Sequence, residues 1–338
     1  MSTSAPTSTD SPAGLHGTDP GPDGPALPDE TDTGIDVVTG AFSYSGKAIA
    51  RQLLGNGRKV RTLTGHPERG ADRTDIEIRP LDFDDADGLV ASLQGATTLY
   101  NTYWVRFAHG GVDHSLAVEN SRSLFRAAQR AGIRKVVHIS ILHPSESSPY
   151  PYFRGKAVVE RSLAESGLRY ACLRPSVLFD ENGVLINNIA WLLRRLPVFC
   201  VGGHGRYQVR PTHVDDLAQL ALEASLWPDD RIVDAVGPER PSFINLVKQV
   251  RAAVGSRSAI VGAPPIVVLA ASRALGVVMR DVLLTPEEYR SMAEGLADSD
   301  APATGSTRLS EWLVDHGDSL GRRYANELTL HFGKPVRP

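Results

Sequence analysis

Cysteine is scarce in this sequence, with two residues, Cys172 and Cys200, among 338. Two cysteines make neither a disulfide framework nor a four-ligand zinc site. Each lies in an apolar run, so we expect buried, unreactive thiols. His109 and His114 are five residues apart, off the spacing of a helix face, with only Asp113 nearby. We therefore expect no bound metal.

A charge excess of one sign is also missing. Thirty-six Lys and Arg against thirty-nine Asp and Glu leave a net charge of −3. Proteins that bind nucleic acid carry a clustered basic excess, so a nucleic-acid partner is excluded. The chain is 41% hydrophobic and 22% charged, which is typical of a folded globular protein. Its length allows a large core without disulfide bonds.

Long uninterrupted apolar runs are absent as well. The longest, residues 266–284, contains Arg273 and Arg280, which argues against a membrane-spanning helix. We interpret this run as a helix that faces the core of a C-terminal lobe. An interfacial helix with peripheral membrane contact is the alternative. The N-terminus has no basic start followed by an apolar segment, so we expect a cytoplasmic protein.

The first 33 residues contain no Lys or Arg, but they hold six Pro, four Gly and six acidic residues. Such a segment cannot bury enough apolar surface to offset its chain entropy. We predict that residues 1–33 form a disordered acidic tail.

From residue 35 onward, strand and helix patterns alternate along the chain. Helices of this size between strands indicate βαβ units, a parallel sheet and a doubly wound α/β fold. We predict a nucleotide-binding core at 34–176 and a smaller, mostly helical lobe at 177–335, interleaved with the last elements of the core. The predicted strands are 35–39, 60–63, 76–81, 97–101, 136–139, 170–173 and 232–236, and the predicted helices are 47–55, 115–131, 153–166, 187–196, 243–254 and 266–284.

A glycine-containing turn joins the first predicted strand to the first helix. Gly40 suits the tight turn, and Gly46 lets the helix pack closely against the strand. The N–H groups at the helix start can then bind a diphosphate. Ser43 stands where a glycine is usual, so it should crowd the phosphate slightly while adding a hydroxyl donor. The residues of this turn expected to bind the cofactor are Thr39, Gly40, Phe42, Ser43, Tyr44 and Gly46, and of these Thr39, Gly40, Ser43 and Gly46 are expected at the diphosphate.

The second predicted strand does not end in the acidic residue that would bind a ribose 2′-hydroxyl. Its end, from Arg61 to His66 with Arg69 nearby, offers hydroxyl and basic groups instead. These suit a 2′-phosphate, so we expect NADP(H), with NAD as the alternative. Asp82 could accept from the adenine amino group, or it could be a simple loop acid. The remaining residues expected at the cofactor are Thr64, His66, Asp82, Phe83 and Asn101.

Tyr152 and Lys156 are four residues apart at the start of a predicted helix, so they share one face. A phenol has an ordinary pKa of ~10, and a cation beside it would lower that value toward neutral pH. Such a pair could protonate a carbonyl oxygen, and Lys156 could also hold ribose hydroxyls. The alternative is a surface tyrosine beside a solvated lysine.

Together these motifs resemble the extended and atypical short-chain dehydrogenase/reductase superfamily. Within it the chain is similar to the NAD(P)H-binding epimerase/dehydratase-like proteins, alongside the negative nitrogen regulator type and the nucleotide-binding accessory subunit of respiratory complex I. The resemblance covers about residues 34–332 and implies a Rossmann core with a C-terminal substrate lobe. It is carried by the glycine turn, Tyr152-x-x-x-Lys156, Leu173-Arg174-Pro175 and His213-Val214-Asp215-Asp216.

The resemblance also implies roles for single residues. Tyr152 and Lys156 would perform the chemistry, and Asn120 falls where such proteins keep an Asn. The second catalytic hydroxyl is expected at position 141, which is Ile141, so Ser140 is the candidate left to serve. Losing one oriented donor costs on the order of 10²–10³ in rate.

Two functions stay open. The first is an NADP(H)-preferring oxidoreductase or epimerase-like enzyme acting on a carbonyl or secondary alcohol, with Tyr152 as acid/base. The second is a non-catalytic NAD(P)H-binding redox sensor or accessory subunit. The expected partner is a small carbonyl or alcohol substrate, and a homodimer is one option for assembly.

Overall fold

The computed structural model describes residues 34–106 and 111–332. The predicted acidic tail at 1–33 and His109 lie outside these residues, so the predictions for them stay untested. Within the described residues, no group of three His, Cys, Asp or Glu side chains could hold a metal ion. Cys172 is buried, whereas Cys200 is only half-buried, and neither is in a disulfide.

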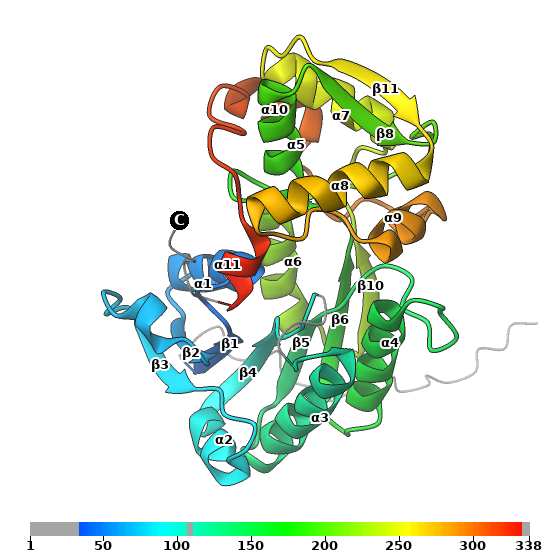
Figure 1. The fold of residues 1–338 in the computed structure, drawn as a ribbon. Helices are drawn as coiled ribbons and strands as arrows, with labels where there is room; N and C mark the ends of the chain where they lie inside the picture. Colours follow the sequence, from blue (N-terminus) through cyan, green and yellow to red (C-terminus); the bar gives the residue numbers. More distant parts are fainter. Residues whose placement is uncertain (1–33, 107–110, 333–338) are drawn as a thin grey trace, which may run out of the picture. The chain divides into compact units, whose positions relative to one another are not determined.

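Seven parallel strands form the central sheet in the order β10-β6-β5-β4-β1-β2-β3, as Figure 1 shows. This order places β2 and β3 on one side of β1 and β4, β5, β6 and β10 on the other, which is the arrangement of a doubly wound nucleotide-binding fold. The predicted α/β fold class is thus confirmed. The strands are β1 (Ile35–Thr39), β2 (Lys59–Thr64), β3 (Ile76–Pro80), β4 (Ala96–Asn101), β5 (Lys135–Ile139), β6 (Arg169–Pro175) and β10 (Arg231–Ala235).

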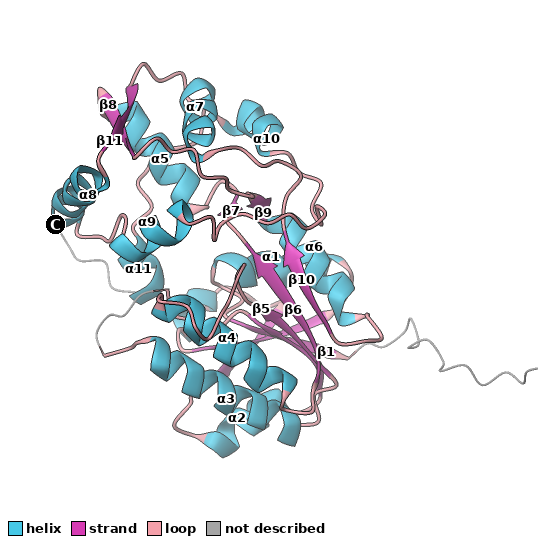
Figure 2. Ribbon diagram, turned by 90° about the vertical axis from the view of Figure 1, so that its right-hand side faces the viewer, coloured by secondary structure: helices cyan, strands magenta, loops and turns pink. Residues whose placement is uncertain are grey.

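Helices cover both faces of this sheet (Figure 2). Successive side chains of a strand face opposite sides, and accordingly Val37 and Val38 of β1 belong to two different cores. The core that contains Val38 packs against α1 (Tyr44–Gly55) and α6 (Val214–Ser225). The core that contains Val37 packs against α2 (Ala86–Leu93), α3 (His114–Arg130) and α4 (Pro151–Ala164).

A third core lies among C-terminal elements. Ile189, Leu246 and Leu313 contribute to it from three different helices. Because α6 and β10 return to the main sheet, the C-terminal half is shared between the two parts; the boundary at residue 176 stays a prediction. The remaining elements are η1 (Pro67–Gly70), β7 (Leu178–Phe179), α5 (Val184–Arg195), β8 (Val198–Gly202), β9 (Thr212–His213), α7 (Phe243–Ala253), β11 (Ala259–Ala263), α8 (Pro265–Met279), α9 (Pro286–Ala293), α10 (Leu309–His316) and α11 (Glu327–Phe332).

The helix predicted at 266–284 differs from the structure in two respects. It ends at Met279, because Arg280 takes a left-handed conformation and the Asp281 N–H bonds back to the Gly276 carbonyl at 2.9 Å. It is also not core-facing, since α8 buries only Val268 and Gly276. That interpretation was therefore wrong. No helix in the described ranges is both long and apolar enough to cross a membrane, and a cytoplasmic location stays a prediction.

Candidate functional site

The glycine turn has the geometry that a diphosphate-binding turn needs. Gly40 has a φ of +67°, which favours glycine. A Cβ on Gly46 would lie 2.2 Å from the Gly40 carbonyl oxygen, so only glycine lets α1 start this close to β1. Ser43 donates from its Oγ to the same carbonyl at 2.6 Å. Its hydroxyl hydrogen is therefore used within the turn rather than offered to a phosphate.

Two aromatic residues of the turn point to different neighbours. Phe42 packs over Gly70, where an added Cβ would come within 2.1 Å of the Phe42 ring. Tyr44 lies near Asp180 and Gly183, and burial together with the Asp180 charge raises the pKa of its phenol. Phe42 thus belongs to the β2–β3 side of the turn, and Tyr44 to the C-terminal side.

Thr39 ties the end of β1 to the segment that follows β4. Its Oγ1 accepts from the N–H groups of Thr102 at 2.8 Å and Tyr103 at 3.1 Å. Asn101 is fully buried, and its Oδ1 accepts from the Tyr103 N–H at 3.0 Å. Both side chains therefore fix the strand ends, and a direct contact with the cofactor stays a prediction for each.

A cavity of about 620 Å³ lies where β2 and β3 end. Of the predicted cofactor-binding residues, Thr64, Asp82 and Phe83 line it, whereas His66 is not among its lining residues. Asp82 also accepts from the Asp84 N–H at 2.9 Å, so its carboxylate shapes the loop as well. This cavity lies at the adenosine end expected for a dinucleotide, and neither Tyr152 nor Lys156 lines it.

Sequence reasoning missed one basic residue of this cavity and misplaced another. Arg79 lines the cavity and pairs with Glu77. It is the register partner of Leu63 at the end of β2, so pairing of the two strands could have found it. Arg61 is instead buried among Glu77 and the Ser92 carbonyl. Arg61 therefore cannot serve a 2′-phosphate.

Lys156 is buried, with 2% of its surface exposed. Its Nζ donates to the Ile139 carbonyl at 2.8 Å and lies 4.7 Å from the centre of the Trp104 ring. Gly155 makes room for that ring, because a Cβ there would come within 2.7 Å of it. Burial lowers the pKa of Lys156 to about 7, and the negative charge of Glu160 opposes the shift.

Tyr152 packs edge-on against Trp104 and His114, with ring centres 5.8 Å and 5.6 Å away. Burial raises the pKa of its phenol to about 12; the positive charge of Arg106 opposes this shift and the negative charge of Glu288 adds to it. Lys156 is not a cause of the shift. The prediction that Lys156 lowers the pKa of Tyr152 is therefore wrong in this structure, because the ammonium is held at β5 instead.

Three buried polar atoms around Lys156 have no hydrogen-bond partner within the described part of the chain: Ser140 Oγ, His138 Nε2 and Trp104 Nε1. The Asn101 amide lies 3.1 Å from His138 Nδ1, and its oxygen is already committed to a backbone N–H. His138 Nδ1 must then accept, which assigns the ring proton to Nε2. Burial and the Lys156 charge keep the pKa of His138 well below its usual value, so the ring is neutral.

These orphaned atoms fit a polar ligand. A buried polar group without a partner costs free energy, so a cluster of them marks a place where a ligand can supply the missing bonds. The cluster lies at the carboxyl ends of β4 and β5, the edge where ligands of open parallel sheets bind. Ser140, Lys156 and Tyr152, the three predicted catalytic residues, thus lie in one region, although Tyr152 and Lys156 do not contact each other through a hydrogen bond.

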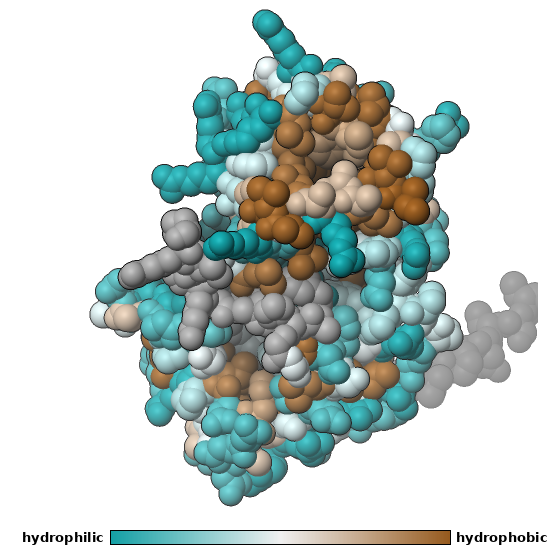
Figure 3. Space-filling view, in the orientation of Figure 1, coloured by the Kyte–Doolittle hydropathy of each residue, from teal (hydrophilic) through white to brown (hydrophobic). Residues whose placement is uncertain are grey.

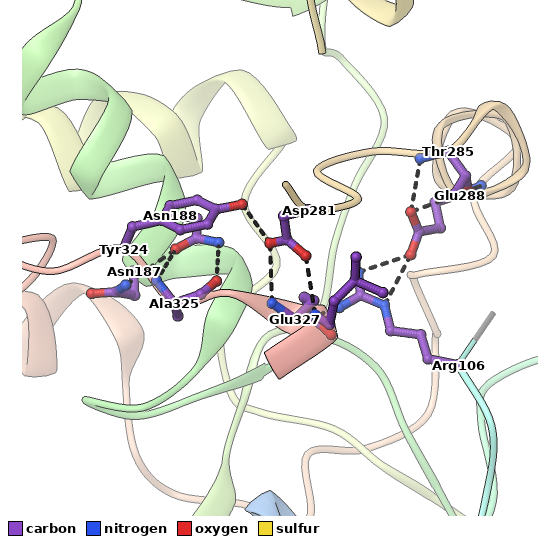
Figure 4. Close-up of polar contacts among 10 residues, drawn as sticks. Arg106, Asn187, Asn188, Asp281, Thr285, Glu288, Tyr324, Ala325 and Glu327 are labelled. Carbon is purple, nitrogen blue, oxygen red and sulfur yellow. Dashed lines mark hydrogen bonds and ion pairs between the residues drawn. The ribbon is translucent and has the colours of Figure 1, made fainter. Parts of the chain in front are cut away.

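A C-terminal segment is attached to Arg106, whose charge acts on Tyr152, and Figure 4 shows the contacts of this arginine. Arg106, just after β4, pairs with Glu288 at 2.8 Å and with Glu327 of α11. Asp281 accepts from the Tyr324 hydroxyl at 2.6 Å and from the Glu327 N–H at 3.0 Å. Residues 324–327 therefore link the loop after β4 to the end of α8. Arg106 and its partner Glu288 are the charged groups that act on Tyr152.

The comparisons with known proteins agree with this geometry. Residues 40–189 match the profile of the family described as NAD(P)H-binding. The chain carries an NAD(P)H-binding domain. That domain includes the glycine turn, the cavity at the ends of β2 and β3, and Lys156.

Curated relatives are more distant. The chain is 22% identical over 244 residues to the photosystem II assembly factor Ycf39 of Cyanidium caldarium, covering 71% of this chain and 78% of the factor. It is 24% identical over 211 residues to the mitochondrial NADH dehydrogenase [ubiquinone] 1 alpha subcomplex subunit 9 of Arabidopsis thaliana, covering 58% of this chain. The match spans 50% of that subunit, or about half its length.

Solved structures share the fold. Triphenylmethane reductase of Citrobacter sp. has a TM-score of 0.68 at 17% identity, covering 84% of this chain and 99% of the reductase. A nucleoside-diphosphate-sugar epimerase of Staphylococcus aureus has a TM-score of 0.65 at 17% identity, covering 82% and 99%. At these identities the likeness establishes the fold alone, and no substrate.

Proposed function

We propose that this chain is an NADP(H)-binding oxidoreductase that reduces a carbonyl group. The observation that carries the proposal is the set of orphaned buried polar atoms around Lys156. Ser140 Oγ, His138 Nε2 and Trp104 Nε1 lack partners within the described residues and lie at the carboxyl end of the sheet. A nicotinamide ribose and a carbonyl substrate would supply the hydrogen bonds that they lack.

The adenosine end of the cofactor would occupy the cavity at β2 and β3, lined by Thr64, Asp82 and Phe83. The N-terminus of α1, shaped by Gly40 and Gly46, would hold the diphosphate. Lys156 and Ser140 would bind the ribose hydroxyls. When bound, NADPH supplies a hydride to an electrophilic carbon.

The raised pKa of Tyr152 favours one direction of reaction. With a pKa of about 12, the phenol holds its proton throughout neutral pH. Such a group can donate a proton to a developing alkoxide, whereas it is a poor base for removing one from an alcohol. We therefore assign Tyr152 as the proton donor of a reduction. The side-chain charge of Arg106 would stabilise the phenolate left behind.

The preference for NADPH over NADH is also part of the proposal. Arg79 lines the adenosine cavity and is half-exposed, so its guanidinium can reach a 2′-phosphate. The same cavity contains Asp82 and Asp84, which would repel that phosphate. The preference thus depends on Arg79, since Arg61 is buried elsewhere.

A non-catalytic redox sensor or accessory subunit is the second candidate. It is favoured by the position of Trp104, whose ring lies over Lys156 Nζ and edge-on to Tyr152. Ile141 also stands where the related enzymes are expected to have a hydroxyl. Under this alternative, the nucleotide would bind without transferring a hydride to a substrate.

One experiment separates the two candidates. The full chain is loaded with NADPH and mixed with aldehydes, ketones and quinones, and the absorbance of the reduced nicotinamide is followed over a single turnover. A reductase oxidises the cofactor with at least one class of acceptor, and Tyr152→Phe slows that step by about 10² or more. Equal behaviour of the wild type and Tyr152→Phe toward every acceptor would refute the assignment, while NADPH fluorescence reports binding separately.

A further inference from the structure

Helix α8 is apolar on the side that faces away from the protein. Seven side chains form this surface, called here the α8 face, and all are exposed. Ile266 and Val277 are each 76% exposed, and Val278 is 75% exposed. At 100° per residue the seven positions form one continuous stripe along the helix. The α8 face consists of Ile266, Val267, Ala270, Ala271, Ala274, Val277 and Val278.

The opposite side of α8 is apolar too, with Val268, Leu269 and Leu275 turned toward the protein. A helix that is hydrophobic all round is expected to be buried on every side. Here the protein buries only Val268 and Gly276 of the helix. The sequence of α8 therefore fits an environment that the described residues do not supply.

Neighbouring strands extend the apolar surface. α8 packs against β8, which pairs with β11 in parallel register. Val198 of β8 is 43% exposed, and Val261 of β11 is 40% exposed. Figure 3 shows apolar residues, in brown, gathered over the region that these elements occupy in Figure 1. Single exposed apolar residues are ordinary, but a contiguous apolar surface of this kind marks an interaction site.

The charge of this part of the chain identifies the partner. Residues 241–280 contain no Asp or Glu, and their five charged residues are all basic: Lys248, Arg251, Arg257, Arg273 and Arg280. Arg257 and Arg273 are exposed, and Arg273 borders the α8 face directly. Apolar residues beside basic ones complement a surface in which hydrocarbon lies below negatively charged groups.

We propose that the α8 face docks on the surface of a lipid bilayer that contains anionic lipids. The fifteen residues of α8 extend over roughly 22 Å, which is less than the ~30 Å hydrocarbon thickness. The helix therefore lies in the plane of the interface. Its valine and isoleucine side chains enter the boundary of headgroups and acyl chains, and Arg273 reaches back to the phosphates.

A second copy of the chain fits this surface less well. A twofold pair would place the α8 face against itself, because the same patch is used on both copies. Arg273, which borders the face, would then lie beside the same arginine of the second copy, and none of the seven residues of the α8 face carries a negative charge. Anionic headgroups supply that missing negative charge.

The test is flotation of the full chain with vesicles, and it needs no enzyme activity. The wild type should float with vesicles of phosphatidylcholine and phosphatidylglycerol, more weakly with pure phosphatidylcholine, and less at high salt. The triple variant Ile266→Gln, Val277→Gln, Val278→Gln should bind at least about tenfold more weakly. Since these residues are solvent-exposed, its thermal unfolding should match that of the wild type. Arg273→Glu should lose the preference for anionic vesicles.

The control variant is Leu226→Gln with Val314→Gln, two residues that are 67% and 80% exposed away from α8. It should bind vesicles as the wild type does. The proposal is overturned if the wild type does not float, or if the triple variant floats equally well. It is also overturned if sedimentation shows a dimer that the triple variant abolishes, because the α8 face would then pair with a second copy.

Discussion

The ammonium nitrogen of Lys156 lies 4.7 Å from the centre of the Trp104 ring. A ring face attracts a cation, so this contact partly compensates for the burial of the charge. It also means that Trp104 covers the group expected to meet the cofactor's ribose. The protonation of Lys156 and the position of Trp104 are therefore linked.

The buried state of Lys156 predicts a pH-dependent stability. Its pKa is about 7 in the folded chain, against an ordinary value of 10.5. Between these values the unfolded chain binds more protons, so the free energy of unfolding rises with pH; below pH 7 both states are protonated and the burial penalty is complete. Relative to Lys156→Met, the wild type should gain up to roughly 4 kcal/mol between pH 7 and pH 10.

Chemical denaturation at a series of pH values measures this difference. The matched control is Lys47→Met, because Lys47 is exposed on α1. Its stability difference from the wild type should stay nearly constant over the same range. A constant difference for Lys156→Met as well would contradict the buried position of the ammonium.

Burial raises the pKa of Tyr152 most, and a further increase comes from Glu288. Its negative charge raises the pKa of the phenol, while its side chain also completes a capping box with Thr285 at the start of α9. Glu288→Gln can keep that capping box and removes the charge. The pKa of Tyr152 should therefore fall below its value of about 12. Tyrosinate absorbance measures it, as the difference between each protein and the same protein carrying Tyr152→Phe.

Glu287→Gln is the control for this titration. Glu287 is the neighbouring acid in the first turn of α9 and is exposed, and it is not among the causes of the Tyr152 shift. Its removal should leave the Tyr152 titration unchanged. An equal shift in both variants would mean that the general charge of the surface, rather than Glu288, controls the phenol.

The glycine turn predicts opposite effects for two alanine substitutions in α1. Gly46→Ala places a Cβ 2.2 Å from a backbone oxygen, so the turn must move. NADPH affinity should fall at least about tenfold, with a loss of stability of ~1–3 kcal/mol. Gly55→Ala meets no atom within 4 Å and should be neutral or stabilise the helix by up to ~1 kcal/mol. Fluorescence titration and thermal unfolding measure both; unchanged NADPH binding by Gly46→Ala would remove the turn from the cofactor site.

Arg79 should separate NADPH from NADH. Arg79→Gln removes the cation that lines the adenosine cavity, so the affinity for NADPH should fall about fivefold while that for NADH stays the same. Arg73→Gln is the control, because Arg73 is an exposed residue paired with Asp75 and does not line the cavity. An equal loss of affinity for both cofactors, or no loss of affinity for NADPH, would show that Arg79 does not bind the 2′-phosphate.

The sheet could be predicted from the sequence because its strands are short apolar runs that end at glycines or polar residues. The predicted strand 35–39 has the bounds of β1, and the predicted strand 136–139 differs from β5 by one residue. Periodicity also placed Tyr152 and Lys156 on one helix. Periodicity could not show that the Trp104 ring contacts both side chains. Trp104 precedes Tyr152 by 48 residues in the sequence, and only the folded sheet places it beside α4.

Apolar sequence was misread for a similar reason. The hydropathy of residues 266–284 predicts that the helix is shielded from water. It does not show whether the core of this chain or another surface provides the shielding. The structure leaves Val277 and Val278 outside. Arg106 was missed as well, because its partner Glu327 is 221 residues away and no local pattern connects them.

The central claim is that the cofactor's nicotinamide end reaches the polar cluster around Lys156, while its adenosine end occupies the cavity at β2 and β3. Titration of Lys156→Met with NADPH and with adenosine 2′,5′-bisphosphate tests this most directly, because the bisphosphate represents the adenosine end alone. The account predicts that Lys156→Met loses about tenfold or more in affinity for NADPH and binds the bisphosphate as the wild type does. Unchanged affinity for NADPH, alongside normal binding of the bisphosphate, would contradict it.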